Sequence, residues 1–448
     1  MNDQRLMNRV NSVVARLRRE DVCMHGFILS VGGEIKATAT YAPFAEDRPH
    51  RMYSISKTMT ALAVGILMGD GKLGLDDHIV DYFADYLPDR PDPRLLRLTI
   101  RDMLRMATCY RQTAYREGID EDWTRPFFTG TPTHEPGTVF HYDTGCSQVL
   151  STLVRRLSGQ HVIDFLNDRL FSPLGASDEK FWLRDPSGNC QGGTGLCMSL
   201  RDLHKVSRAV MEGGRGLVPR WFCEEMRKRH LLNPLGPTPE ERQGYGWQVW
   251  RTRCGWAMYG LGGQLAVVCP EKDALLCTIA DTRLDQVGVQ RIYDAFFDEV
   301  YPYIGREDMA PATLRLTAHA LGSEPAFTIP EAGPFFFDEG NPLGLKSVAL
   351  RGRELLWENA RGQNALRFGV GENVVDTFPG WPQIPTLCSG GWIDEGLLRV
   401  RCFLIGNAPC GVDMLLRFSG DSLTVHARRS TDPATVGYDG VATGFKSA

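Results

Sequence analysis

Ser54 and Lys57, in the run Ser54-Ile55-Ser56-Lys57, are the side chains of this chain best suited to covalent chemistry. Residues three apart on a helix face the same side, one turn from each other. A serine at the start of a helix lies beside unpaired backbone N–H groups, which favour an alkoxide and a developing oxyanion. A desolvated lysine has a lowered pKa and can accept the serine proton. This spacing therefore indicates a serine nucleophile with a lysine base.

The residues that follow Ser54 predict the helix that this chemistry needs. Apolar side chains recur there at helical spacing, at Met59, Leu62, Ile66 and Leu67. The alternative interpretation of Ser54 is a helix N-cap without chemistry, because serine is a preferred cap residue. A second run of the same spacing, Ser177-Asp178-Glu179-Lys180, lies in a polar stretch and opens no apolar helix. We interpret that second run as a solvated loop.

The order of the other elements predicts where the Ser54 helix lies in the fold. Two strand-like runs, Gly26 to Val31 and Glu34 to Tyr41, flank Gly32-Gly33 and predict a hairpin before the helix. Residues 75–210 are mostly helical in pattern, and residues 244–281 return to strand character. A helix is expected over Gln286 to Tyr303, and the polar residues near Pro311 are a plausible linker.

From about residue 325 the pattern changes to short alternating runs separated by Gly and Pro. Leu398-Arg399-Val400-Arg401-Cys402 is one example, and Leu423-Thr424-Val425-His426-Ala427 is another. Such runs predict an all-β module, either a sandwich or a barrel. We therefore expect one domain over residues 1–310, with a helical insertion at about 75–210, and a C-terminal all-β domain over residues 325–448.

Composition excludes several classes of protein. The net charge is −4, and no basic stripe indicates nucleic-acid binding. No apolar run is long enough to span a bilayer, and the Arg-rich first 20 residues lack the apolar core of a secretory signal. The 12 cysteines show no zinc spacing, so we expect reduced, buried thiols and a cytoplasmic location. We expect no metal site and no cofactor, because no His, Asp and Glu cluster has metal-ligand spacing.

Further motifs follow Ser54-x-x-Lys57 in a recognisable order. Phe140-His141-Tyr142-Asp143-Thr144-Gly145 precedes a helix, Gly195-Leu196 leads to Asp202-Leu203, and Tyr245-Gly246-Trp247 opens the later strands. Over residues 20–303 this order resembles the serine β-lactamase and penicillin-binding protein superfamily, most closely its class C and esterase-like branch. The resemblance implies an α+β fold of the β-lactamase/transpeptidase type, with an antiparallel sheet flanked by helices, an inserted and mostly helical subdomain, and here a C-terminal all-β module.

The second motif of the family, Tyr-x-Asn, is altered in this chain. Tyr142 matches the tyrosine, which the resemblance implies works with Lys57 in proton transfer, but Thr144 stands at the asparagine position. A phenol with a pKa of about 10 is a poor base unless a nearby cation lowers that pKa, and Lys57 would supply the cation. The alternative interpretation of Tyr142 is a buried core tyrosine. A hydroxyl lacks the paired donor and acceptor of an amide, so we expect weakened substrate anchoring at Thr144.

The third motif, Lys-Thr-Gly or His-x-Gly on an edge strand, is replaced by Leu261-Gly262-Gly263. The resemblance implies that the oxyanion hole uses the N–H groups of Ser54 and of Gln264, the residue after the last glycine. Glycines at this position let a substrate approach the backbone closely. The missing cation or imidazole at Leu261 argues against substrates of the penicillin or D-Ala-D-Ala type. The alternative interpretation of residues 260–263 is a plain hairpin turn.

Two functions therefore follow from the sequence. The first is a serine hydrolase that cleaves a small ester, amide or peptide-like substrate through an acyl-enzyme on Ser54. The second is an inactive descendant that keeps the groove as a ligand-binding or sensory site, because two of the three motifs are altered. A structural role of the C-terminal module, which could cover the groove or form an oligomer contact, remains open.

Overall fold

The computed structural model describes residues 4–112, 115–285, 287–306, 311–322, 331–378, 381–405, 410–430 and 437–447. Two compact units emerge, and the larger comprises Met1–Arg16, His25–Ala280 and Val289–Leu316. The smaller comprises Leu17–Met24, Asp281–Gly288 and Thr317–Ala448. The predicted start of the second domain, residue 325, lies outside the described residues.

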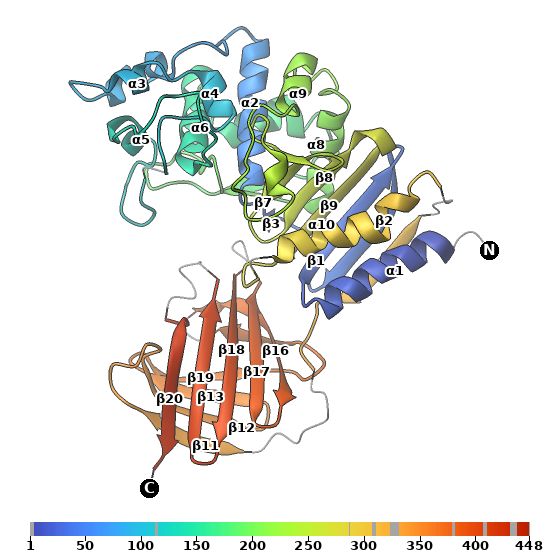
Figure 1. The fold of residues 1–448 in the computed structure, drawn as a ribbon, viewed down its shortest axis with the longest axis vertical. Coiled ribbons are helices and arrows are strands. Elements are labelled where there is room, and N and C mark those ends of the chain that lie inside the picture. The colour runs from blue at the N-terminus through green and yellow to red at the C-terminus, as the bar shows by residue number, and fades with distance from the viewer. Residues whose placement is uncertain are drawn as a thin grey trace. The chain divides into compact units, whose positions relative to one another are not determined.

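A seven-stranded sheet forms the centre of the larger unit, in the order β10-β2-β1-β9-β8-β7-β6 (Figure 1). Its strands are β1 (Cys23–Val31), β2 (Glu34–Ala42), β6 (Trp250–Thr252), β7 (Gly255–Gly260), β8 (Gln264–Cys269), β9 (Ala274–Asp281) and β10 (Ala312–Thr317). The predicted β1–β2 hairpin is confirmed, and Gly32 and Gly33 take φ values of 61° and 82° in its turn. Glycine takes this left-handed conformation at no steric cost, which is why the pair turns the chain here.

Helices cover this sheet and build a second layer beside it. They are α1 (Gln4–Arg19), α2 (Ile55–Gly69), α3 (Pro93–Leu96), α4 (Ile100–Leu104), α5 (Arg125–Thr129), α6 (Thr144–Ser158), α7 (Val162–Leu166), α8 (Leu200–Met211), α9 (Arg220–Met226) and α10 (Gly288–Glu299). Helices α1 and α10 lie side by side over the sheet (Figure 1), joined by a 2.7 Å ion pair between Arg16 and Asp298. Helix α2 contacts β7 and α6, and α8 contacts β8, so α2 lies between the sheet and the helical insertion.

Shorter elements complete the larger unit. Strands β3 (His50–Arg51), β5 (Leu196–Met198) and β4 (Phe181–Trp182) form a small sheet in the order β3-β5-β4. Single helical turns occur at η1 (Ile79–Tyr82), η2 (Ala84–Tyr86), η3 (Asn167–Phe171), η4 (Glu241–Gln243), η5 (Pro270–Lys272) and η6 (Tyr301–Tyr303). The helix expected over Gln286 to Tyr303 is present as α10 followed by η6, and residue 286 itself lies outside the described residues.

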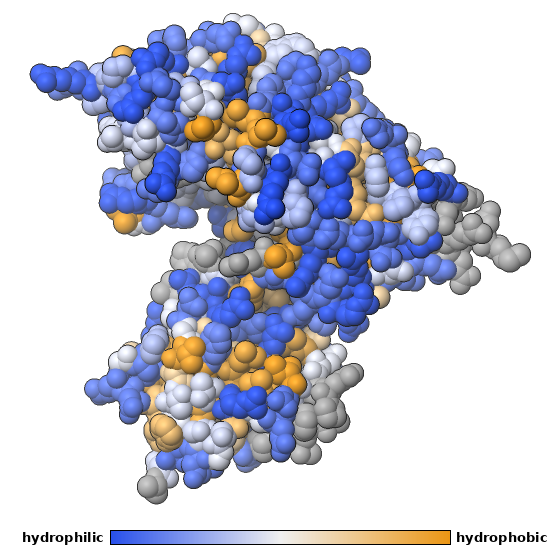
Figure 2. Space-filling model, in the orientation of Figure 1, coloured by the Kyte–Doolittle hydropathy of each residue, from blue (hydrophilic) through white to orange (hydrophobic). Residues whose placement is uncertain are grey.

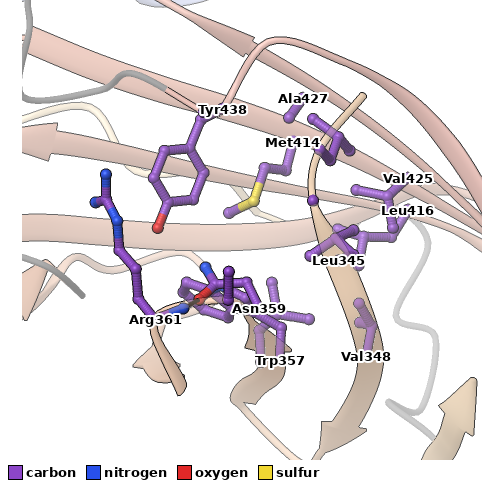
Figure 3. A pocket seen from close by; sticks show the side chains of 15 residues that line it. Leu345, Val348, Trp357, Asn359, Arg361, Met414, Leu416, Val425, Ala427 and Tyr438 are labelled. Carbon is purple, nitrogen blue, oxygen red and sulfur yellow. Dashed lines mark hydrogen bonds between the residues drawn. The ribbon is translucent and has the colours of Figure 1, made fainter. Parts of the chain in front are cut away.

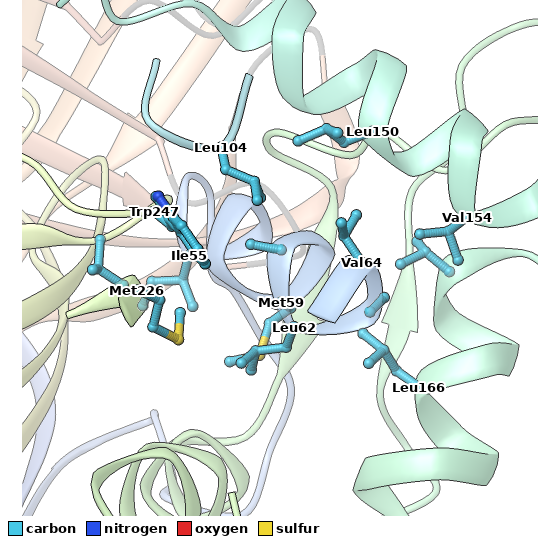
Figure 4. Close-up of a cluster of buried hydrophobic side chains, with 14 of the residues drawn as sticks. Ile55, Met59, Leu62, Val64, Leu104, Leu150, Val154, Leu166, Met226 and Trp247 are labelled. Atoms are coloured by element: carbon cyan, nitrogen blue, oxygen red, sulfur yellow. The ribbon is translucent and has the colours of Figure 1, made fainter. Parts of the chain in front are cut away.

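Helix α2 is buried on all sides, whereas the sequence indicated only one apolar stripe. Every residue from Ile55 to Met68 is buried. Apolar side chains of α4, α6, α7 and α9 surround it, as Figure 4 shows for Leu104, Leu150 and Leu166. Its polar residues are satisfied by backbone groups: the hydroxyls of Thr58 and Thr60 donate to carbonyls of distant segments. A helix enclosed in this way holds its first turn in a fixed place.

The expectation of reduced thiols is confirmed for ten cysteines and wrong for one pair. Ten free cysteines are buried, whereas Cys254 and Cys269 form a disulfide. The β7–β8 hairpin brings the two residues together, with their Cα atoms 4.9 Å apart. No local spacing pattern predicts this disulfide, because the two cysteines become neighbours only when the hairpin forms.

The smaller unit contains ten antiparallel strands, as the predicted all-β module requires. They run in the order β14-β13-β12-β11-β20-β19-β18-β17-β16-β15. Their bounds are β11 (Ala332–Phe337), β12 (Leu345–Arg351), β13 (Glu354–Asn359), β14 (Gly362–Arg367), β15 (Val374–Phe378), β16 (Trp381–Asp394), β17 (Leu397–Leu404), β18 (Cys410–Ser419), β19 (Ser422–Arg429) and β20 (Gly440–Lys446). The end strands β14 and β15 contact each other, so the sheet is a near-barrel.

The inside of the near-barrel is apolar and contains a small cavity. Its volume is about 180 Å³, and it lies between strands β12 and β13 on one side and β18 and β19 on the other (Figure 3). Trp357, Met414 and Leu416 line it, with Arg361 and Tyr438 at one side. On the face of the protein drawn in Figure 2, apolar side chains form separate small patches among polar ones. None of the helices that the structure describes is both long and apolar enough to cross a membrane.

The first prediction concerns the core around α2. Leu62→Ala should lower the free energy of unfolding of the larger unit by about 2 to 5 kcal/mol, because Leu62 is fully buried and a packed core relaxes only partly around a deleted side chain. Urea unfolding followed by circular dichroism measures this loss. Ile119→Ala is the control, because 66% of Ile119 is exposed. Equal effects of the two changes would contradict the central position of α2.

Candidate active site

Ser54 and Lys57 lie together at the start of α2. Ser54 is the N-cap residue of the helix, and its side chain makes no capping hydrogen bond. The Lys57 amine donates to Ser54 Oγ at 3.1 Å and to the carbonyl oxygen of Gly193 at 2.8 Å. Lys57 is only 1% exposed. The Ser54 hydroxyl is thus available to the lysine instead of capping the helix, which disfavours the interpretation of Ser54 as a simple N-cap.

The backbone before Ser54 is clamped on both sides. Tyr53 takes a φ of 46°, in the left-handed region that tyrosine rarely adopts. The Met52 N–H donates to the Leu196 carbonyl at 2.8 Å, and a Cβ added to Gly260 would lie 2.0 Å from the Met52 carbonyl oxygen. The serine therefore lies at a sharp turn pressed between β5 and the end of β7.

Burial lowers the pKa of Lys57 to about 7. The nearby groups Asp143 and Cys146 oppose this shift, but desolvation of the ammonium outweighs them. At neutral pH a large fraction of Lys57 is therefore the neutral amine, which can accept a proton. An ordinary surface lysine, with a pKa of about 10.4, could not do so.

Gly193 leaves the space that the lysine amine occupies. A Cβ at this position would lie 2.6 Å from Thr144 Cγ2 and 3.1 Å from Lys57 Nζ. The Gly193 carbonyl can approach the amine because no side chain intervenes. The sequence contained a signal for this residue, the glycine-rich run Gly192-Gly193-Thr194-Gly195, but it did not show which atom the run would present.

Tyr142 lies beside Ser54 and Lys57, but its pKa is raised, whereas the sequence suggested that Lys57 would lower it. Its ring centroid lies 5.0 Å from Lys57 Nζ, and it is packed at 5.4 Å against the ring of Trp250. Burial raises the pKa of Tyr142 above its ordinary value, and a hydrogen bond with Ser54 only partly offsets this. The expected lowering by Lys57 is absent, because the buried lysine itself tends to lose its charge. Tyr142 therefore keeps its proton at neutral pH.

Thr144 begins helix α6 directly behind the site. Asp143 is the N-cap of α6 and accepts a hydrogen bond from the Gly145 N–H at 2.9 Å. Thr144 faces Gly193, as the 2.6 Å approach of its methyl group to an added Cβ shows. It does not belong to the residues that line the pocket in front of Ser54. The position that carries asparagine in the family thus contributes packing beside Lys57 here.

A pocket of about 500 Å³ opens in front of Ser54 and Tyr142. Aromatic rings, a proline-containing loop and one carboxylate form its walls, and the lining residues are Ser54, Phe140, His141, Tyr142, Asn233, Leu235, Gly236, Pro237, Glu241, Trp250, Tyr259 and Leu261. Sequence reasoning missed Trp250, Tyr259 and the 233–241 loop, because only the fold brings them beside residues far away in the chain. Among the described residues, no group of three or more His, Cys, Asp or Glu side chains could hold a metal ion.

The expected edge-strand motif Leu261-Gly262-Gly263 forms the turn between β7 and β8. The φ values of Gly262 and Gly263 are 88° and 94°, which a strand cannot accommodate. Leu261 is 44% exposed and lines the pocket with Ser54. Gln264 is fully buried, and its side-chain amide donates to the carbonyls of Leu261 and Ala280. Gln264 therefore holds the turn in shape, while Leu261 faces the pocket.

The second Ser-x-x-Lys run lacks the geometry of the first. The structure places Ser177 to Lys180 in a loop, as predicted. Lys180 is buried, however, so the loop is less solvated than expected. Its amine donates to the backbone carbonyl of Ser177 at 2.6 Å instead of to the hydroxyl. Equal spacing in sequence thus gives a lysine–serine hydroxyl contact only where a helix begins.

A family comparison agrees with this arrangement. The model of the Beta-lactamase family matches residues 22–289. The chain belongs to this family. The match covers the Ser54 helix, the helical insertion and the strands up to β9, and it stops before the near-barrel.

The individual proteins that this chain resembles share only a low sequence identity with it. The 6-aminohexanoate-dimer hydrolase of Paenarthrobacter ureafaciens is 25% identical over 226 residues, which cover 46% of this chain and 58% of that protein. The chain thus spans little more than half the length of this curated relative. The solved hydrolase EstCE1 matches with a TM-score of 0.54 at 16% identity, over 66% of this chain and 99% of that one. The octameric penicillin-binding protein homologue of Pyrococcus abyssi matches with a TM-score of 0.50 at 14% identity, over 98% and 99%.

The second prediction follows from the position of Lys57. If the neutral amine is the base, kcat/KM should rise as the pH rises through about 7, the pKa of Lys57. Asp143→Asn should move this rise to lower pH, because Asp143 holds the pKa of Lys57 up and asparagine still caps a helix. A pH–rate profile of both proteins with one ester checks the shift. A rise that stays in place, or moves to higher pH, would contradict the proposed base.

Proposed function

We propose that this protein is a serine hydrolase that cleaves a small ester or amide through an acyl-enzyme on Ser54. The observation that carries the proposal is the 3.1 Å hydrogen bond between the buried Lys57 amine and Ser54 Oγ. Lys57 takes the hydroxyl proton as Ser54 Oγ bonds to the substrate carbonyl carbon. Tyr142, which keeps its proton and hydrogen bonds with Ser54, passes a proton between Lys57 and the leaving group. Water then attacks the ester of Ser54 and releases the acid.

The oxyanion that forms during this attack needs two N–H donors. The Ser54 N–H at the start of α2 supplies the first. We assign the second to the β7–β8 turn. The resemblance of the third motif points to Gln264, but Leu261 lies on the pocket wall whereas Gln264 is fully buried. We therefore favour the Leu261 N–H, with the Gln264 side chain holding the turn through the Leu261 carbonyl.

The substrate is a small ester, amide or peptide-like molecule. The activities of two similar proteins support this, since one is a 6-aminohexanoate-dimer hydrolase and another a hydrolase with promiscuous acyltransferase activity. The cation or imidazole of the third family motif is replaced by Leu261, which gives a carboxylate of the penicillin type no partner at that position. We expect esters and amides to be hydrolysed more readily than β-lactams.

A second candidate is an inactive protein that uses the same pocket to bind a ligand. Thr144 in place of asparagine and Leu261 in place of lysine or histidine favour it. The lowered pKa of Lys57 argues against this candidate. Burying an amine is unfavourable for stability, and a protein that only binds a ligand does not need a lysine with a lowered pKa. We also propose that copies of this chain associate, since a solved penicillin-binding protein homologue that matches 98% of the chain is octameric.

The third prediction separates the two functions. Wild-type protein should hydrolyse at least one of a panel of p-nitrophenyl esters and anilides of increasing acyl length. Ser54→Ala should remove this activity, and Ser177→Ala should leave it unchanged, because Lys180 does not contact the Ser177 hydroxyl. Initial rates over the panel give the comparison. Hydrolysis that survives unchanged in Ser54→Ala would disprove the mechanism, and a folded wild type that hydrolyses nothing would favour the ligand-binding protein.

A further inference from the structure

The pocket in front of Ser54 contains a carboxylate, Glu241, that the mechanism does not use. Glu241 begins the short turn η4 and lines the pocket with Ser54, Tyr142 and Trp250. Within the described part of the chain, its side chain forms no ion pair, and its carboxylate accepts a hydrogen bond from the backbone N–H of Thr238. Its backbone is held, because its N–H donates to Thr238 Oγ1 and its carbonyl accepts from Asn233 Nδ2.

The cations near Glu241 are engaged elsewhere. Its neighbour Glu240 is buried and forms an ion pair with Arg253. Arg242 donates to the backbone carbonyls of Gly236 and Pro237. Lys57 donates to Ser54 and Gly193, and Glu241 does not belong to the groups that raise its pKa. The carboxylate thus lines the pocket without an ion pair from any residue that the structure describes.

The charge of Glu241 affects the pKa of other residues that line the pocket. Burial raises the pKa of Tyr142 and of Tyr259, the charge of Glu241 raises both further, and all three residues line the same pocket. Burial raises the pKa of Glu241 itself, and the hydrogen bond with Thr238 offsets this only in part. A partly desolvated carboxylate without a cationic partner is unfavourable, and a bound cation would reduce that penalty.

Aromatic rings around the same space suit a cation as well. Trp250 contacts both tyrosines of the pocket: its ring centroid lies 5.4 Å from that of Tyr142 and 6.1 Å from that of Tyr259. Phe140 packs against Trp250 at 5.9 Å. The faces of such rings attract ammonium groups, most strongly at tryptophan. The other charged candidate among the lining residues, His141, has its pKa lowered by burial and is neutral at neutral pH.

We propose that Glu241 selects substrates that carry an ammonium group, which it binds in the cage of Trp250, Tyr259 and Tyr142. This inference rests on the proposed hydrolase function and adds the chemical class of its substrate. The uncharged part of the substrate contacts Leu235 and Leu261 at the pocket rim. Glu241 forms no bond to the reacting atoms, so it is a specificity residue and not part of the proton transfer.

The fourth prediction uses pairs of esters that differ only in charge. In one series of p-nitrophenyl esters the acyl chain ends in trimethylammonium or in its neutral isostere, tert-butyl. In a second series of thioesters the same two groups end the thiol side. For one series the wild type should prefer the cationic ester by about tenfold in kcat/KM at the best chain length. Glu241→Gln should bring this preference close to one, because it should lower kcat/KM for the cationic ester by a much larger factor than for the neutral ester.

Glu121→Gln is the matched control, because it removes the same charge from an exposed residue outside the pocket. This variant should keep the wild-type preference. A wild-type preference that persists in Glu241→Gln would overturn the inference. An equal rate for cationic and neutral esters in both wild-type series would overturn it too.

Binding separates this inference from the hydrolase proposal. Calorimetry with hexylammonium and with hexan-1-ol can be carried out on Ser54→Ala, with and without Glu241→Gln. Tighter binding of hexylammonium than of hexan-1-ol that is lost in Glu241→Gln would support the inference. If no ester were hydrolysed in the same study, that result would count against the hydrolase proposal alone. Hydrolysis that depends on Ser54, without any preference for the cation in rate or binding, would refute the inference and leave the hydrolase standing.

Discussion

The burial of one amine, Lys57 Nζ, is the constraint on which the candidate site depends. An ammonium ion loses its hydration in such a place, so the neutral amine is favoured and the pKa falls to about 7. The same burial fixes the amine between the Ser54 hydroxyl and the Gly193 carbonyl. Desolvation and position therefore come from one structural feature. A lysine in the same spacing at Lys180 reaches only a backbone carbonyl, which shows that spacing alone does not create this pair.

The rest of the larger unit serves to keep that amine dry and in place. Helix α2 is enclosed by the helical insertion and by β7, so its first turn cannot move without disturbing the core. The absence of a side chain at Gly193 makes room for the amine, and the turn at Tyr53 presents Ser54 to the pocket. The pocket in turn is built from the 233–241 loop, Trp250 and the β7–β8 turn, which determine what can approach Ser54.

The sequence predicted the parts of this arrangement that depend on neighbours in the chain. The hairpin at Gly32-Gly33, the helix after Ser54 and the alternating strands of the C-terminal module each follow a local period or turn. The sequence did not predict contacts between segments that are far apart in the chain. The Cys254–Cys269 disulfide, the exposure of Leu261 and the placement of Glu241 in the pocket exist only after folding. The prediction of a lowered pKa for Tyr142 was wrong for a related reason, because burial of the phenol raises its pKa and outweighs the other influences on it.

The measurement that tests the central claim most directly is the intact mass of the folded protein after exposure to a fluorophosphonate. Wild-type protein should gain one adduct, and peptide mapping should place it on Ser54, because the buried Lys57 amine activates this hydroxyl. Lys57→Met should fold and remain unmodified. No adduct on folded wild-type protein, or an equal adduct on Lys57→Met, would show that the buried lysine does not activate Ser54 and would contradict the account.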